Sequence, residues 1–396
     1  MTYNFDDPIE RKGSQCIKYD AVGDFLGSDD LIPMWVADMD FRTPPFVMEA
    51  LRKRLEHEVM GYPVRPEGFF NSIIDWNRRN HQWEVGRKWI TFSPGVVPAV
   101  NMAVLAYTEP GDSIITQPPV YFPFFTAVKD HGRKLLYNQL ILKNGRLCMD
   151  FDDLEKKASA GAKMIIISSP HNPGGSVWTQ SELSRLAEIC LKYKVLMVSD
   201  EIHCDLVYQP YKHIPLASLS PKIAAQTVTT IAPSKTFNLS GLSTAAVIIS
   251  DEILRKKFTQ VMEHLHIGGG SIMGNIALEA AYTGGDDWSK QLMAYLGKNL
   301  DFLEKYLEEK IHCVKMIRPE ATFLVWLDCK GLNLPEDELK NFFLNTAKLG
   351  LNPGVMFGPG GEGYMRMNIG CTLATLNKAL DQLRDAVDEL GLGNRK

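Results

Sequence analysis

MIIISSPHNPGGSVWTQSELSRLAEICLKYKVLMVSD, residues 164–200, holds the pattern that decides the fold. The apolar run from Met164 to Ser169 is typical of a buried strand, and Val195 to Ser199 is a second such run. Between them, the segment from Ser181 to Tyr193 has apolar side chains at helical spacing, at Leu183, Leu186, Ala187 and Cys190. Strand, helix and strand in this order predict a crossover unit, so the two strands should be parallel members of one sheet.

Similar runs on both sides of this unit extend the sheet. Further buried strands are predicted at Ser113 to Thr116, Thr227 to Ile231 and Ala245 to Ile249. The first large unit of the chain is therefore predicted to be α/β, with a mostly parallel sheet.

The pattern changes after Gly284-Gly285. A long helix is predicted to run through Glu309, with leucines 292, 296, 300, 303 and 307 along one side. Strands at 314–317, 323–327 and 364–369, a helix at about 336–349 and a last helix ending near Leu390 then predict a small α+β domain. We expect an N-terminal segment (1–45) that packs on the small domain or the cleft, a large domain (46–288) and a small C-terminal domain (289–396).

Composition and charge exclude several classes of protein. The 396 residues are 45% hydrophobic and 23% charged, which is typical of a soluble globular protein. A net charge of -4 without any basic block argues against nucleic-acid binding. No apolar run reaches membrane-spanning length, and the acidic first ten residues do not form a signal peptide. The seven cysteines are scattered and lack C-x-x-C spacing, so we expect a reduced cytoplasmic protein without a metal site.

Polar residues follow three of the predicted strands. SPHNPGG (169–175) contains Asn172, DEIH (200–203) begins with Asp200, and APSKTF (232–237) contains Lys235. Ligands of open parallel sheets bind beyond the carboxyl ends of the strands, so these three side chains should share one site. Each motif alone is also typical of a turn, a helix cap or an exposed loop. Together they supply an amine for a Schiff base, a carboxylate for a pyridine nitrogen and an amide for a phenolate oxygen, which predicts a pyridoxal 5'-phosphate site.

A fourth motif predicts where the phosphate of that cofactor binds. SPGVVP (93–98) stands at the head of a predicted helix, where the backbone N–H groups of Gly95, Val96 and Val97 and the helix dipole favour an anion. The hydroxyl of Ser234 is predicted to reach the same phosphate. Tyr121 follows the strand from Ser113 to Thr116, so its ring is predicted to stack on the pyridine face.

Nearly the whole chain resembles the fold-type I pyridoxal-phosphate enzymes of the class I/II aminotransferase family. Within that family it is most similar to the MalY/PatB group of carbon–sulfur β-lyases. The motifs that carry the resemblance are VADMDF (36–41), SPGVVP (93–98), PHNPGG (170–175), DEIH (200–203) and SKTFN (234–238). The resemblance implies Lys235 as the Schiff-base lysine, Asp200 at the pyridine nitrogen, Asn172 at the phenolate oxygen and Tyr121 on the ring.

The same resemblance implies a substrate site and a partner subunit. Arg366 is expected to bind the substrate carboxylate, Asp38 to lie in the substrate site, and Tyr62 to reach the phosphate of a neighbouring subunit in a homodimer with shared active sites. In YMRMNI (364–369) the strand alternation places Arg366 on the face opposite Met365, Met367 and Ile369, and guanidinium geometry suits a carboxylate. A solvated strand arginine and a surface tyrosine are the plain alternatives.

Two positions differ from ordinary aminotransferases. Many of them carry a tyrosine three residues after the pyridine-binding aspartate, where this chain has His203, and an arginine eight residues after the lysine, where it has Ser243. We interpret His203 as a cofactor-site histidine with satisfied hydrogen bonds rather than a proton donor. The expected activity is cleavage of cystathionine or another S-substituted cysteine to pyruvate, ammonia and a thiol. An aminotransferase and a cofactor-binding regulatory protein remain the alternatives.

Overall fold

The structure is a computed structural model, and it describes residues 1–393. Its centre is a seven-stranded sheet with the strand order β2-β10-β9-β8-β7-β3-β4. These strands are β2 (Ile90–Ser93), β3 (Ser113–Thr116), β4 (Lys134–Tyr137), β7 (Met164–Ser168), β8 (Leu196–Asp200), β9 (Thr227–Ile231) and β10 (Ala245–Ile248). Only β10 runs antiparallel to its neighbours in this sheet. The predicted mostly parallel sheet is confirmed.

Both faces of this sheet are covered, as its continuously apolar strands require. On β7 the side chain of Ile166 belongs to one apolar core, whereas Ile165 and Ile167 belong to the core on the opposite face. The helices of this part of the chain are α3 (Pro45–Leu55), α4 (Glu67–His81), α5 (Val96–Tyr107), α6 (Pro123–Lys129), α7 (Phe151–Ser159), α8 (Gln180–Tyr193), α9 (Pro221–Ala224), α10 (Glu252–His264) and α11 (Ile272–Gly284). A hairpin of β5 (Ile141–Lys143) and β6 (Arg146–Cys148) lies outside the main sheet.

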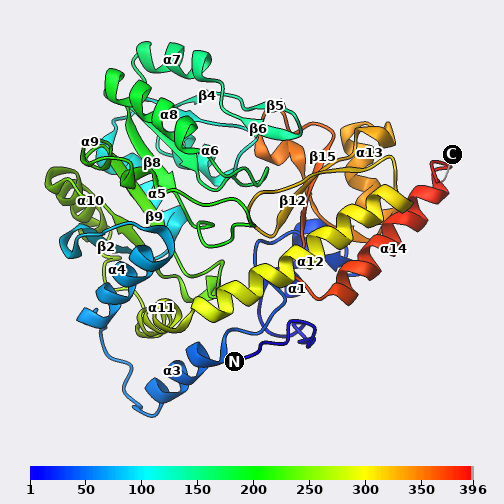
Figure 1. The fold of residues 1–396 in the computed structure, drawn as a ribbon, viewed down its shortest axis with the longest axis horizontal. Coiled ribbons are helices and arrows are strands. Elements are labelled where there is room, and N and C mark those ends of the chain that lie inside the picture. Colours follow the sequence, from blue (N-terminus) through cyan, green and yellow to red (C-terminus); the bar gives the residue numbers. More distant parts are fainter. Residues whose placement is uncertain (394–396) are drawn as a thin grey trace.

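One long helix connects the two parts of the molecule. In Figure 1, α12 (Asp286–Lys310) runs from beside α11 to beside α14 (Leu373–Glu389). The second sheet has the order β11-β12-β15-β14, from β11 (Lys315–Ile317), β12 (Leu324–Asp328), β14 (Asn352–Pro353) and β15 (Tyr364–Asn368). This α+β arrangement agrees with the predicted small domain, and the limits drawn for the three parts of the chain stay a prediction.

The helix predicted at 336–349 is shorter than expected. The α-helix α13 spans Glu336–Asn341, a π-helical turn continues to Thr346, and Leu349–Gly350 forms strand β13. Lys348 has a left-handed backbone with φ of 55°, which ends the helical path. Leu349 pairs instead with Ile32 of β1 (Ile32–Pro33), a partner too far away in the sequence for periodicity to reveal.

The N-terminal segment, with α1 (Ile17–Asp20) and α2 (Val22–Leu26), packs on the C-terminal part of the chain. Besides the β1–β13 pair, the Asn368 side-chain amide donates to the backbone oxygens of Val36 and Asp38, each at 2.6 Å. The ring of Phe5 lies 5.0 Å from that of Trp288. These contacts fix residues 36–41 beside the sheet edge where the predicted site lies. Within residues 1–393, no helix has both the length and the apolar character needed to cross a membrane.

Candidate active site

A cavity of about 210 Å³ lies at the carboxyl ends of β7, β8 and β9. Ser168 ends β7, Asp200 ends β8 and Ala232 follows β9, so the cavity occupies the position expected for a ligand of a parallel sheet. Nine of the predicted site residues line it: Gly95, Val96, Val97, Tyr121, Asn172, Asp200, His203, Ser234 and Lys235. Folding therefore brings together motifs that are spread over about 140 residues of sequence.

Lys235 lies in the turn that follows β9. Its Nζ donates to the backbone oxygen of Ala37 at 2.7 Å. Burial lowers the pKa of Lys235 to about 8, although the nearby charge of Asp38 opposes this effect. The next residue, Thr236, is held by a hydroxyl bond to Asp205 (2.9 Å) and by a bond from the Trp288 indole to its backbone oxygen (3.0 Å). The amine is thus presented by a fixed turn, and a larger fraction of it is neutral near physiological pH than in an exposed lysine.

Asp200 is the carboxylate of the cavity. It is buried, and its Oδ1 accepts the backbone N–H of Ile202 at 3.1 Å. Burial raises the pKa of Asp200 to about 7, and the positive charge of Lys235 partly counteracts the shift. A protonated ring nitrogen beside this carboxylate would favour its charged form, as the predicted pyridine contact requires.

Asn172 and Arg366 are joined by a hydrogen bond. The guanidinium of Arg366 donates to Asn172 Oδ1 at 3.0 Å, to Asn352 Oδ1 at 2.7 Å and to the backbone oxygen of Trp35 at 2.8 Å. All three acceptors are neutral, and burial lowers the pKa of Arg366 to about 10. A buried guanidinium that bonds only neutral oxygens favours an added anion. The predicted role in carboxylate binding has this physical support.

His203 has an unexpected environment. Its ring is buried, and within the described structure its Nδ1 has no hydrogen-bond partner. The prediction that His203 has satisfied hydrogen bonds therefore does not hold for the protein alone. Burial and the positive charges of Lys235 and Arg366 lower the pKa of His203 to about 3, so the ring is neutral. A neutral imidazole with a free nitrogen at a cavity wall is suited to a hydrogen bond with a bound group.

The amino end of α5 forms the other end of the cavity. Gly95 is the N-cap with φ of 140° and ψ of 169°, a conformation open almost only to glycine, and no side chain caps the helix. The first-turn N–H groups therefore have no side-chain acceptor and suit an anion. The hydroxyl-bearing residues Ser234, Ser240, Ser243 and Thr244 line the same cavity. This donor set fits a phosphate.

Three predicted residues are not among those that line the cavity: Arg366, which reaches Asn172 at its wall, Tyr62 and Asp38. Tyr62 is fully exposed, with a relative exposure of 104%, and lies on a different surface hollow beside α11. Asp38 has its carboxylate oxygens bound by the Arg11 guanidinium, each at 2.9 Å, and Lys18 lies 3.8 Å away. The partner-subunit role of Tyr62 and the substrate role of Asp38 stay predictions.

Several residues that line the cavity were not predicted from the sequence. Ser168, whose hydroxyl accepts the backbone N–H of Asn172 at 3.1 Å, was predicted only as part of the strand from Met164 to Ser169. Ser240 and Thr244 follow Lys235 by five and nine residues, and the helical turn that returns them to the cavity has no pattern in the sequence. Ser243, noted only as a departure from aminotransferases, also lines the cavity. Short hydroxyl-rich segments after a candidate lysine are the signal that was available.

Comparisons with known proteins find relatives that match nearly the whole chain. The profile of the family described as aminotransferase class I and II matches residues 29–383. The chain is 44% identical over 385 residues to the cystathionine beta-lyase PatB of Bacillus subtilis, covering 97% of this chain and 100% of that protein. Cystalysin of Treponema denticola, solved with a pyridoxal 5'-phosphate cofactor, has 33% identity and a TM-score of 0.96 over 98% of this chain and 100% of its own. A PLP-bound C-S lyase of Staphylococcus hominis has 31% identity and a TM-score of 0.92, with 98% of each chain covered.

Proposed function

The chain belongs to the aminotransferase class I and II family, and from that premise we propose that it is a pyridoxal 5'-phosphate-dependent carbon–sulfur β-lyase. Its substrates are cystathionine or related S-substituted cysteines. One observation carries the proposal: a single cavity joins an amine, a carboxylate and an amide to an uncapped helix end, beside a buried guanidinium with only neutral acceptors. Relatives with high coverage are named as cystathionine or C-S lyases, and for this reason we propose β-elimination rather than transamination as the reaction.

The cavity offers one partner for each polar part of the cofactor. Lys235 would hold the cofactor aldehyde covalently, Asp200 its ring nitrogen and Asn172 its phenolate oxygen. Tyr121 would stack on the ring, and its position is fixed by a backbone bond of 3.1 Å from its N–H to the Asn172 oxygen. The amino end of α5 and the surrounding hydroxyls would hold the phosphate. His203, with its free Nδ1, is the remaining donor or acceptor at the wall of the cavity.

The protein's own residues supply binding and proton transfer. The cofactor, when bound, withdraws electrons from the substrate's α-carbon. Arg366 would bind the substrate carboxylate and so orient the α C–H bond toward the cavity. Lys235, when displaced from the cofactor by the substrate amine, would take the α-proton at Nζ, which its lowered pKa near 8 allows at neutral pH. Departure of the thiolate from the β-carbon and reaction with water then give pyruvate, ammonia and a thiol.

We further propose a homodimer whose active sites are shared. Residues 55–64 form no strand and expose apolar side chains at Leu55, Val59, Met60, Tyr62 and Val64, by 52% to 104%. A cluster of this kind favours burial against another chain. Tyr62 lies within it, at a distance from its own chain's cavity, so a partner's cavity is the proposed destination of its hydroxyl.

A reducing compartment such as the cytoplasm is proposed for the same protein. All seven cysteines, which fall within the described residues, are free thiols. Free thiols persist where glutathione and thioredoxin keep proteins reduced.

The experiment that tests the lyase is incubation with cystathionine, with and without a keto-acid acceptor. Sustained release of pyruvate and thiol without acceptor is expected, because elimination regenerates the starting enzyme. An aminotransferase would instead stop after one turnover and resume only when a keto acid is added. That result would mean that the protein is an aminotransferase with the same fold and not a lyase. A protein that binds the cofactor and turns over neither way would be regulatory.

A further inference from the structure

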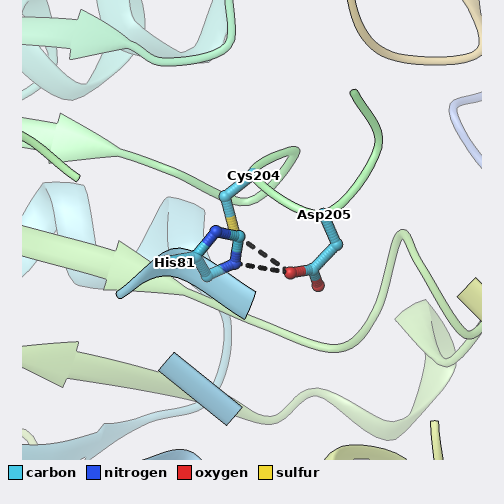
Figure 2. A group of neighbouring side chains, drawn as sticks. All are labelled: His81, Cys204 and Asp205. Atoms are coloured by element: carbon cyan, nitrogen blue, oxygen red, sulfur yellow. Dashed lines mark hydrogen bonds and ion pairs between the residues drawn. The ribbon is translucent and has the colours of Figure 1, made fainter. Parts of the chain in front are cut away.

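A second group of reactive side chains lies behind the active-site loop. The loop after β8 carries His203 on the side of the cofactor cavity, and its next two residues, Cys204 and Asp205, face His81 at the end of α4. Figure 2 shows these three side chains pointing toward one another. His81 Nε2 lies 2.8 Å and Cys204 Sγ 3.6 Å from Asp205 Oδ1, and the three donor atoms lie within 4.8 Å of one another.

The chemistry of this donor set is specific. Imidazole nitrogen, thiolate and carboxylate are the ligands that Zn²⁺ uses, whereas Ca²⁺ and Mg²⁺ prefer oxygen alone. Tetrahedral Zn²⁺ with bonds of about 2.0–2.3 Å places its donor atoms roughly 3.5 Å apart. The sulfur–oxygen separation already has this value. The nitrogen–oxygen pair is closer because a proton now lies between the two atoms, and it needs to open by less than an ångström.

The carboxylate is already oriented by its surroundings. Asp205 Oδ2 accepts the Thr236 hydroxyl at 2.9 Å, and Oδ1 accepts the Trp76 indole N–H at 2.9 Å. The side chains of His81 and Asp205 are 6% and 2% exposed. A thiolate and a carboxylate together neutralise a divalent cation, so the burial that disfavours either anion alone does not oppose the complex. Hydrogen-bonded ligands of this kind are typical of metal sites.

The group is reached from solvent through a separate cavity. A hollow of about 570 Å³ is lined by all three residues and by His213, and neither Lys235 nor His203 is among the residues that line it. The His213 ring lies 5.4 Å from that of His81, with its Nε2 bound to Glu201 at 2.9 Å. The cavity gives a metal ion an entry path and leaves room for a water molecule as fourth ligand.

We propose that His81, Cys204 and Asp205 form a binding site for a thiophilic divalent metal of the Zn²⁺ class, with a fourth coordination position open to this cavity. We expected no metal site because the cysteines are scattered and lack C-x-x-C spacing. His81 and Asp205 are 124 residues apart, so their proximity is visible only in the structure. The bound ion connects α4 to the loop that carries the active-site residue His203 and that begins directly after Asp200 at the end of β8. It therefore stabilises the folded protein.

The test is metal binding to the cofactor-loaded protein. After exhaustive dialysis against a chelator, the protein is titrated with Zn²⁺ by calorimetry and with Cd²⁺ by its ultraviolet thiolate charge-transfer band, and thermal unfolding is followed with and without Zn²⁺. One metal ion per chain and a rise in Tm are expected. Loss of a ligand in Cys204→Ser or His81→Gln should weaken binding by about 10- to 100-fold or more, since loss of an outer-shell partner alone has that effect.

Cys148→Ser is the matched control. The Cys148 sulfur lies 3.4 Å from the Arg146 guanidinium, a cationic neighbour that disfavours a metal, so this variant should bind Zn²⁺ like the parent protein. Cys204→Ser is nearly isosteric, and its unfolding transition without metal shows whether the fold is kept. If His81→Gln does not fold, the pair of serine variants still decides. Absence of binding by the parent, or equal affinity in Cys204→Ser and Cys148→Ser, would overturn the proposal.

Discussion

Arg366 is the residue whose environment in the structure most directly predicts a ligand. Its guanidinium is buried on β15 and bonds only neutral oxygens. The replacement Arg366→Lys keeps the charge and removes the planar fork, so binding of the substrate carboxylate should weaken. We expect a fall of about 10- to 100-fold in kcat/KM for cystathionine, mainly through KM, because a charge-assisted bond contributes about 1.5–3 kcal/mol.

Unchanged kcat/KM in Arg366→Lys would place the carboxylate elsewhere. Arg318→Lys serves as the control, since Arg318 is an exposed arginine that pairs with Asp301 and Glu304 on the surface.

Lys235 predicts a pH dependence for loading of the cofactor. Only the neutral amine reacts with an aldehyde, and burial lowers the pKa of Lys235 from 10.5 to about 8. The neutral fraction therefore grows as pH rises through 8 and is nearly complete one to two pH units higher. The rate at which cofactor-free protein takes up pyridoxal 5'-phosphate should reach half its maximum near pH 8 and level off one to two pH units higher, measured by absorbance after rapid mixing.

A rate whose half-maximum lies near pH 10.5 instead of near pH 8 would show an ordinary lysine. In the control, Lys235→Ala should retain no borohydride-fixed cofactor and show no activity. A trapped cofactor on a different lysine in that variant would contradict the role of Lys235.

At the scale of elements, the amino end of α5 predicts how the phosphate is held. Gly95 has φ of 140° and ψ of 169°, a region that costs a residue with a Cβ on the order of 1–3 kcal/mol. Gly95→Ala should move the helix end away from the phosphate and weaken cofactor binding by about tenfold or more, measured as release of the cofactor during dialysis. The lyase activity of Gly95→Ala should recover when excess cofactor is supplied.

Gly161→Ala is the control for backbone strain alone. Gly161 has φ of 98°, and an added Cβ there would meet nothing within 4 Å. It follows α7 on the surface, so its replacement should lower stability and leave cofactor release unchanged. Equal cofactor release from Gly95→Ala and Gly161→Ala would show that the amino end of α5 does not hold the phosphate.

The elements also show what sequence patterns can and cannot reveal. β3 and β9 have the predicted bounds, because short apolar runs between turn residues leave few alternatives. β2 (Ile90–Ser93) was missed, although its mixture of Thr and Ser with apolar residues is like that of β3 and β9. Its place beside β10 depends on pairing between residues about 150 positions apart. Long-range pairing of this kind leaves no local periodicity, and the same applies to Leu349 and its partner Ile32.

The site was predictable where a residue follows a strand directly. Asn172, Asp200 and Lys235 each lie within about four residues of a strand end, so the position of the sheet determines where they meet. The roles of Arg366 and Tyr62 were predicted from the family resemblance. Sequence patterns do not show that a strand of the small domain, or a segment of another subunit, lies close to the cavity, because that proximity depends on tertiary and quaternary structure. The unsatisfied Nδ1 of His203 was equally invisible in the sequence.

At the scale of the whole molecule, the exposed segment around Tyr62 predicts a dimer in which each cavity is completed by the other chain. Sedimentation should give a homodimer, and Tyr62→Ala should weaken cofactor retention. Mixing inactive Lys235→Ala chains with Tyr62→Ala chains under conditions of subunit exchange should raise activity per Tyr62→Ala chain. The reason is that each hybrid contains one cavity with both Lys235 and a partner Tyr62.

An active monomer, or mixing that gives no gain over the separate variants, would contradict the shared site. Tyr211→Ala is the control, as Tyr211 is 43% exposed and lies outside the segment around Tyr62.

The hydrogen bond from Arg366 to Asn172 spans the two parts of the molecule, since β15 belongs to the C-terminal sheet and Asn172 follows β7 of the large one. A shared bond of this kind makes the two binding events thermodynamically linked. The guanidinium occupies only Oδ1 of Asn172, so the amide N–H groups stay available to donate to the ring oxygen. Each of the two bonds orients the amide for the other, and a bound ring or carboxylate is therefore felt at both ends of this contact. Linkage is reciprocal: the factor by which bound cofactor raises the affinity for the amino acid equals the factor by which the bound amino acid raises the affinity for the cofactor.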